Sequence, residues 1–187
     1  MGISKSDPII VVGASASGLS VALHLSLRGF TKVSVFAKDD NIPLGDLTNV
    51  VYRAAHDAGV QFFLGQQVDQ ISYVSTLVGK KNAGIRTRKG FYPSSLVIIE
   101  AGTGNSSSEI GQWHAPNSLA IPLSCYTNIK SNSLVEYVPQ SSSSVVLLSG
   151  NSVQGSKMSL VGPLVVDLVE ATSGQQSENS PQPLSKL

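Results

Sequence analysis

The sequence predicts an α/β fold that opens with a βαβ unit, and three observations predict it. A short β-branched run at 8–13 ends in a glycine-containing turn, as expected of a strand buried on both faces of a parallel sheet. Residues 17–27 carry apolar side chains at helical spacing and stop at Gly29. Residues 32–36 return to a strand pattern, which completes a βαβ unit of ordinary length.

The remaining elements follow from the same patterns. They are, in order, a helix at 46–58 that stops at Gly59, a strand at 60–64, a meander of strands at 68–78 and 84–88 around a turn at 80–82, and a buried strand at 95–99. The apolar positions predict that the first helix buries Leu19, Ala22, Leu23 and Leu27, and that the second buries Val50, Val51, Ala54 and Ala58.

Beyond residue 104 the chain is rich in serine and its elements are short. We expect strands at 119–123 and 134–138, a linker at 141–144, a buried strand at 145–148, and a helix that begins at Pro163 and buries Leu164, Val165, Leu168 and Val169. From Ser173 the composition predicts a disordered tail. The chain therefore divides into one domain at 1–172, in which 106–144 is a reduced region, and a tail at 173–187.

Composition narrows the function classes. With 187 residues, 41% hydrophobic and 13% charged, the chain can bury one globular core. A net charge of +1 gives no broad attraction to nucleic acid, and no apolar run approaches the roughly 20 residues of a membrane span. The single cysteine, Cys125, cannot form an internal disulfide, which fits a reducing compartment. We find no metal-ligand spacing, and His24, His56 and His114 have no evident catalytic partner.

The two ends of the chain carry targeting patterns. Ser185-Lys186-Leu187 is the tripeptide S-K-L, the address read by the peroxisomal import receptor, so we expect that receptor as a partner and the peroxisome as the location. The first residues also match a loose N-myristoylation pattern in which Gly2 would be the acceptor. The alternative for those residues is a short polar segment that leads into the first strand.

The glycine-containing turn predicts a nucleotide-cofactor site. Gly13 permits the tight turn, Gly18 permits close packing of helix against strand, and the N–H groups of Gly13, Ala14, Ser15 and Gly18 lie where a cofactor pyrophosphate would bind. Ser15 stands in place of the middle glycine of the usual trio and adds bulk there. A βα turn without a ligand is the alternative.

The end of the second predicted strand lacks the acid that usually binds ribose hydroxyls. Ala37 holds the natural position, and Lys38, Asp39 and Asp40 follow it. Either Asp39 moves into the ribose site or ribose binding is lost. Lys38 could instead meet a 2′-phosphate, which favours NADP.

Residues 9–36, with the segment from Gly18 to Leu25 and then Arg28-Gly29-Phe30, resemble the FAD-binding start of the D-amino-acid-oxidase-like flavoproteins, especially fungal fructosyl amino acid oxidases and sarcosine oxidases. Later segments fall in the family's order at 55–62, 97–102 and 149–158. The resemblance implies a Rossmann-like FAD-binding domain and peroxide-releasing oxidation of a small-molecule amine. It also implies adenine contacts at Val68, cofactor contacts at Gly102, and Lys157 as a catalytic and flavin-contacting residue.

The sequence departs from that family in three places. Only a few residues connect Asp40 to Asp46, where the family has a long insertion, the substrate region at 106–144 is reduced, and we find no counterpart of the flavin-tethering cysteine. Cys125 lies in a strand-like stretch and is expected to be a small buried residue. Three hypotheses remain: an FAD-dependent amine oxidase, a non-catalytic shortened protein that keeps the nucleotide scaffold, and an NAD(P)-binding dehydrogenase.

Overall fold

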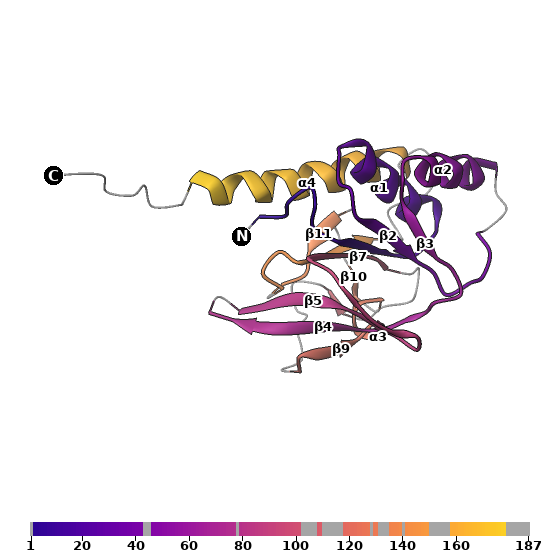
Figure 1. Cartoon of the computed structure of the whole chain (residues 1–187). Helices are drawn as coiled ribbons and strands as arrows, with labels where there is room; N and C mark the ends of the chain where they lie inside the picture. The colour runs from indigo at the N-terminus through magenta and orange to yellow at the C-terminus, as the bar shows by residue number, and fades with distance from the viewer. Residues whose placement is uncertain are drawn as a thin grey trace.

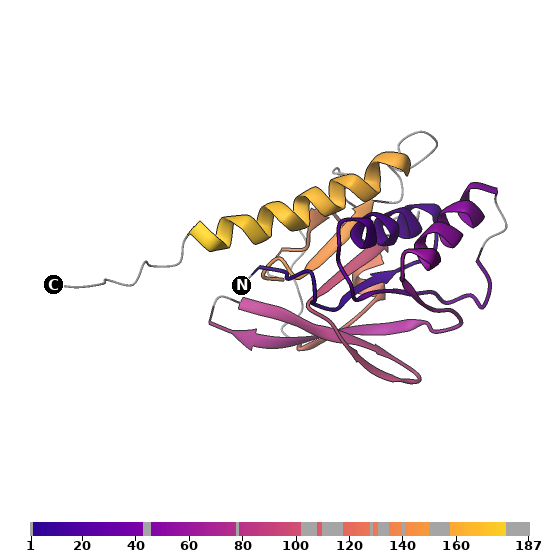
Figure 2. The same ribbon diagram turned by 45° about the horizontal axis from the view of Figure 1, so that its top comes forward.

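The structure is a computed structural model, and it describes residues 2–42, 46–77, 79–101, 108–109, 118–127, 129–130, 135–139, 141–149 and 158–178. These residues form three layers, in which the three long helices cover one face of a central sheet, and an antiparallel sheet with one short helix covers the other (Figure 1). The turned view shows the long last helix and the first two helices side by side above the central sheet (Figure 2). The predicted α/β fold is confirmed.

The central sheet has six strands in the described residues, in the order β11-β12-β7-β1-β2-β3. Only β11 runs antiparallel to its neighbour, at one edge. The strands are β1 (Ile9–Val12), β2 (Val33–Phe36), β3 (Gln61–Phe63), β7 (Leu96–Ala101), β11 (Val135–Tyr137) and β12 (Val145–Ser149). The predicted βαβ opening is present, because β1 and β2 are parallel neighbours.

A second sheet of four strands has the order β6-β5-β4-β9, and a two-stranded pairing joins β8 to β10. These strands are β4 (Val68–Thr76), β5 (Gly79–Thr87), β6 (Gly90–Pro93), β8 (Ser108–Glu109), β9 (Ala120–Pro122) and β10 (Ile129–Lys130). The helices are α1 (Ala16–Leu27), α2 (Asp46–Asp57), α3 (Ser124–Thr127) and α4 (Met158–Glu178). Among these described helices, none is long and apolar enough to cross a membrane.

Alternation along the central strands builds two cores. On β1, Ile9 and Val11 pack into the core beneath the helices, whereas Ile10 and Val12 pack into the core above the antiparallel sheet. The strands β7 and β12 divide their side chains in the same way. A strand buried on both faces needs a continuous apolar run, because successive side chains point to opposite faces. This is why the sequence pattern located these strands correctly.

The helices bury only part of the faces that the spacing predicted: Leu19 and Ala22 of α1 are fully buried as expected. In α1, Leu27 is 67% exposed, and in α2, Val50 is 64% exposed. Val21 and Leu25 are buried instead in α1, and Ala55 in α2. The buried face of α1 therefore includes predicted and additional residues, because the position of each helix on the sheet decides which side chains are covered.

The last helix also departs from the prediction. It begins at Met158 rather than at Pro163, which lies inside it. It continues to Glu178, beyond Ser173, where a disordered tail was expected to begin. Ser173 is tied to the start of the chain, because the N–H of Ile3 donates to its hydroxyl at 3.1 Å. This contact joins the helix to a segment 170 residues away.

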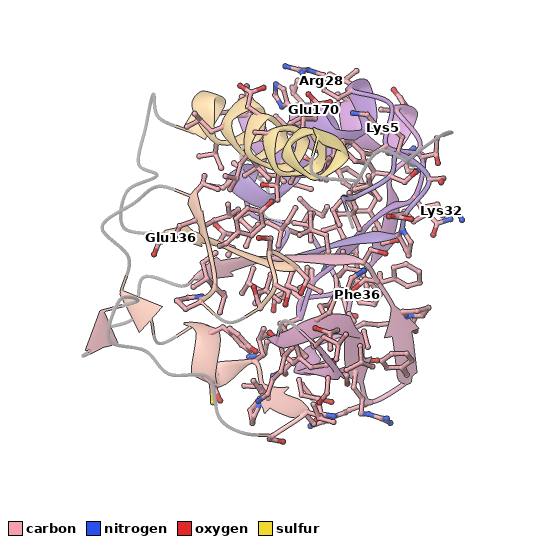
Figure 3. All side chains as sticks on the ribbon, turned by 90° about the vertical axis from the view of Figure 1, so that its left-hand side faces the viewer. Lys5, Arg28, Lys32, Phe36, Glu136 and Glu170 are labelled. Atoms are coloured by element: carbon pink, nitrogen blue, oxygen red, sulfur yellow. The ribbon has the colours of Figure 1, made fainter. Side chains whose placement is uncertain are left out.

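An ionic cluster lies where the N-terminal segment, the end of α1 and α4 meet (Figure 3). Arg28 pairs with Glu170 at 2.8 Å and with Asp167 at 3.2 Å, and Lys5 also pairs with Glu170. The pKa of Glu170 is lowered, first by its hydrogen bond with Lys5. These groups are well exposed, so the cluster adds little stability, but it aligns α4 on α1.

Two polar segments that were expected to be loops are ordered parts of the fold. Lys80, Lys81 and Asn82, predicted as a turn, lie within β5. The predicted linker at 141–144 is the turn between β11 and β12, and it contains Ser142 and Ser143 at φ 49° and 55°. Both ends of that turn are buried, at Ser141 and Ser144.

Cys125, expected in a strand, lies in the short helix α3. It is half-buried and packs at the edge of the core above the antiparallel sheet.

Asn82 joins the two sheets. It is 3% exposed, its amide nitrogen donates to the carbonyl of Ser94 at 2.9 Å, and its amide oxygen accepts from the N–H of Gly84 at 2.9 Å. Its own N–H donates to the Ser144 hydroxyl at 2.7 Å. Tertiary partners therefore satisfy a residue whose type usually favours turns.

We expect Asn82→Ala to lower the free energy of unfolding by about 3 kcal/mol, because it leaves buried backbone groups without partners. Urea denaturation followed by circular dichroism measures the change. Arg86→Ala, which removes an exposed side chain from the same strand, is the control and should cost no more than about 0.5 kcal/mol. Equal effects of the two substitutions would contradict this account of Asn82.

Candidate functional site

The strand order of the central sheet reverses between β1 and β7. From β1 the chain proceeds through β2 and β3 toward one edge of the sheet, whereas β7 and β12 lie on the other side of β1. In open α/β sheets, ligands bind at the carboxyl ends of the strands where the order reverses in this way. The residues that follow β1 and end β7 therefore define the candidate site.

The turn after β1 has the backbone geometry that its glycines predicted. Gly13 has φ +119°, a conformation that a side chain would strain, and its N–H donates to the carbonyl of Phe36 at 2.9 Å. A Cβ on Gly18 would lie 2.3 Å from the carbonyl oxygen of Gly13. These two glycines let α1 begin directly against the end of β1.

Ser15 has a role that the sequence did not reveal. Its hydroxyl oxygen caps α1 by accepting from the N–H of Ser17 at 3.2 Å and from that of Gly18 at 3.5 Å. The same hydroxyl donates to the carboxylate of Glu100, whose two oxygens lie at 2.5 and 2.6 Å. Serine here connects the helix N-terminus to an acid at the end of β7.

Glu100 places a carboxylate inside the turn. Its Oε2 would lie 2.8 Å from a Cβ on Gly13, so the acid occupies the space beside the glycine. Burial raises the pKa of the Glu100 carboxyl above its usual value, and the hydrogen bond from Ser15 offsets part of that rise. An acid at a helix N-terminus is favoured by the helix dipole. A carboxyl group of the protein itself, that of Glu100, therefore lies beside the turn where a cofactor phosphate would bind.

The segment after β2 packs against the turn between β3 and β4. The carbonyl of Ala37 accepts from the N–H of Gln66 at 2.8 Å, and the carbonyl of Asp39 accepts from the N–H of Gly65 at 3.0 Å. The side chain of Asp39 is exposed, and Asp40 Oδ1 occupies the space that a side chain on Gly65 would need. Asp39 thus contributes a backbone hydrogen bond between the segment after β2 and the turn between β3 and β4.

A pocket of about 340 Å³ lies beside that segment. Its lining residues are Lys38, Gly65, Gln66, Gln67, Thr87, Arg88 and Lys89. Three of them are cationic, and among the described residues none that lines the pocket is acidic. Sequence reasoning had singled out Lys38 alone, because Arg88 and Lys89 come from the distant turn between β5 and β6.

The other predicted site residues lie as follows. Ala14 is half-buried and packs against the core beneath the helices. Val68 is 3% exposed, begins β4 and pairs with Thr87. Gly102 and Lys157, together with the S-K-L residues, lie outside the described residues.

The described histidines occupy separate positions. His24 Nδ1 lies 2.8 Å from the carbonyl oxygen of Ser20, inside α1, and His56 is exposed at the end of α2. His114 lies outside the described residues. Among the side chains that the structure places, no three of His, Cys, Asp or Glu gather in a way that could hold a metal ion.

The architecture defines a class, an α/β domain with a glycine turn at a strand-order reversal. No protein-family model and no curated protein matches the sequence. Solved structures with a similar arrangement include fructosamine oxidase (Amadoriase II) from Aspergillus fumigatus, at 15% identity and TM-score 0.41, with 52% of this chain and 47% of that chain covered. Amadoriase I from the same fungus is 15% identical, at TM-score 0.42, with 55% and 50% covered.

A bacterial example is glycerol-3-phosphate dehydrogenase from Bacillus halodurans, described as complexed with FAD. It is 12% identical at TM-score 0.43, and the match covers 54% of this chain and 35% of the dehydrogenase. The matched region thus spans about half the length of the two Aspergillus oxidases and about a third of the dehydrogenase. At these identities and TM-scores the similarity carries no argument about activity.

Proposed function

We propose that this chain is the cofactor-binding part of an FAD-dependent oxidoreductase. The observation that carries the proposal is the turn from Gly13 to Gly18, which places the N-terminus of α1 at the carboxyl ends of β1 and β7. Backbone N–H groups at a helix N-terminus bind pyrophosphate, and the reversal of strand order is where dinucleotides bind in such sheets.

The backbone geometry of the residues present fits a pyrophosphate. The charge of Glu100 sets one condition on its binding. Gly13 and Gly18 let α1 begin directly against the end of β1, which brings the first N–H groups of the helix to this edge of the sheet. An ionised Glu100 would repel phosphate oxygens, whereas a protonated Glu100 would be neutral and could donate a hydrogen bond to them. Burial already raises the pKa of this carboxyl. Binding of a dinucleotide is therefore expected to go with uptake of a proton at Glu100.

The finer proposal is an amine oxidase of the peroxisome. Its support is the order of sequence segments that resemble fructosyl amino acid and sarcosine oxidases, together with the S-K-L tripeptide that an import receptor would bind. When bound, FAD would supply the redox chemistry, in which an amine is oxidised to an imine and its two electrons and two protons reduce O₂ to hydrogen peroxide. Gly13, Ala14, Ser15 and Gly18 would hold the cofactor pyrophosphate.

A second candidate is a non-catalytic protein that keeps the nucleotide scaffold. The Ser15 hydroxyl favours it, because this group accepts from N–H groups at the helix N-terminus and donates to Glu100 without a ligand. The connection between β2 and α2 is also short, since β2 ends at Phe36 and α2 begins at Asp46. This candidate predicts either no flavin or bound flavin without turnover.

The visible absorption spectrum of purified protein, supplemented with FAD and then desalted, tests the cofactor proposal. We expect a retained flavin band in the unaltered chain and its loss in Gly13→Ala, whose added methyl group would meet Glu100. Gly29→Ala is the matched control, because Gly29 also has positive φ and nothing lies within 4 Å of the added Cβ. A folded protein without flavin colour would overturn the proposal. If the flavin band is retained, peroxide release with secondary amines or glycated amino acids separates the oxidase from the non-catalytic candidate.

A further inference from the structure

The pocket after β2 concentrates positive charge in a chain that is nearly neutral overall. Lys38, Arg88 and Lys89 are three of the 13 basic residues, and all three are exposed. In the described part of the chain, none of them forms an ion pair. The carboxylate of Asp40 lies close by, against Gly65, but it is not part of the lining.

The walls of the pocket are fixed by contacts that do not depend on a ligand. The N–H of Gln66 donates to the carbonyl of Ala37, and the hydroxyl of Tyr92 donates to Gln66 Oε1 at 2.9 Å. The turn between β5 and β6 forms another side of the pocket, and there the N–H of Lys89 donates to Thr87 Oγ1 at 3.1 Å. The cations therefore project from an ordered backbone.

The end of β2 links the pocket to the glycine turn along the backbone. Gly13 bonds to the carbonyl of Phe36, and Lys38 follows two residues later. In βαβ nucleotide-binding folds the end of the second strand meets the adenosine ribose, and a cation there accommodates a 2′-phosphate. A volume of about 340 Å³ is small for a whole dinucleotide and suits a phosphate with its sugar.

We propose that Lys38, Arg88 and Lys89 form a binding site for a phosphate monoester. A guanidinium can bind phosphate with two parallel hydrogen bonds, and two ammonium groups supply the remaining charge for a dianion. The same chemistry is present in the 2′-phosphate of NADP and in a phosphorylated sugar. FAD carries no phosphate monoester, so FAD binding does not require these three cations.

Isothermal titration calorimetry of the full chain tests the site with matched pairs of ligands: NADP against NAD, and glucose 6-phosphate against glucose. We expect the phosphorylated member of at least one pair to bind about tenfold or more tightly than its partner, and Arg88→Ala with Lys38→Ala to remove that difference. Preference within the first pair assigns the monoester to a dinucleotide. Preference within the second pair alone assigns it to a small phosphorylated molecule.

Two controls keep the test specific. Lys32→Ala removes an exposed cation outside the pocket and should leave both pairs unchanged. FAD retention should be the same in the double variant as in the unaltered chain, so a failure here is distinct from a failure of the FAD proposal. Equal affinities within both pairs, or a preference that survives the double substitution, would overturn the site.

Discussion

Glu100→Gln is expected to raise the affinity of the chain for ADP, a minimal pyrophosphate ligand, by about tenfold or more at pH 8. The carboxylate lies beside Gly13 at the N-terminus of α1, where a pyrophosphate would bind. Repulsion between like charges near a protein surface amounts to a few kcal/mol at contact distance, and each 1.4 kcal/mol is about tenfold in affinity. Glutamine keeps an oxygen that can accept from Ser15, so it removes charge with little change in shape.

The pH dependence of ADP binding separates this electrostatic effect from a change in packing. In the unaltered chain the affinity should rise as pH falls through the pKa of Glu100, which burial places above its usual value. In Glu100→Gln the affinity should change little over that range. Asp57→Asn, which removes an exposed carboxylate at the end of α2, is the control and should behave like the unaltered chain. Tighter binding in Glu100→Gln with an unchanged pH profile would contradict proton uptake at Glu100.

The same substitution has a readout that needs no ligand. Because the pKa of Glu100 is higher in the folded than in the unfolded chain, the folded state binds more protons between the two pKa values. Its contribution to stability is therefore fully present below the unfolded pKa and is lost as pH rises through the folded pKa. The free energy of unfolding of Glu100→Gln should exceed that of the unaltered chain by an amount that grows with pH across this window.

The strands and the glycine turn could be predicted from the sequence because their causes are local. Strands with both faces buried need unbroken apolar runs, as in β1 at Ile9–Val12 and in β7 from Leu96 to Ile99, and a tight turn into a helix needs glycine at Gly13. Such features depend on residues close together in the chain. They were located almost to the residue.

The acid in the turn and the basic pocket could not be predicted, because both depend on contacts between distant segments. Ser15 and Glu100 are 85 residues apart, and they meet only because β7 pairs with β1 so that both strands end at one edge. A local signal is present, since Glu100 directly follows the buried apolar run of β7. What the sequence lacks is the register that places it opposite Gly13.

The polar residues at 80–82 and 141–144 predicted exposed segments, and this was wrong where other parts of the fold supply their hydrogen-bond partners. Asn82 and the serines at 141 and 144 have turn-forming side chains, yet all three are buried. Asn82 bonds across to Ser94 and Ser144, and Ser141 donates to the carbonyl of Val138 at 2.7 Å. Buried polar groups of this kind fix the position of one sheet on another, and their partners are visible only in the fold.

Gly18→Ala is expected to lower the free energy of unfolding by about 3 kcal/mol, because the new methyl group would meet the carbonyl oxygen of Gly13 and force α1 away from β1. Thermal and urea denaturation measure the loss. Gly29→Ala is the matched control: it carries only the strain of φ +88°, about 1 kcal/mol, since nothing lies within 4 Å of its added Cβ. Equal losses would show that α1 shifts without penalty. A larger loss at Gly18 would mean that helix packing alone requires this glycine, so a chain without a cofactor would retain it. The presence of Gly18 would then be no evidence for a dinucleotide, and the cofactor question would rest on Gly13 and Glu100.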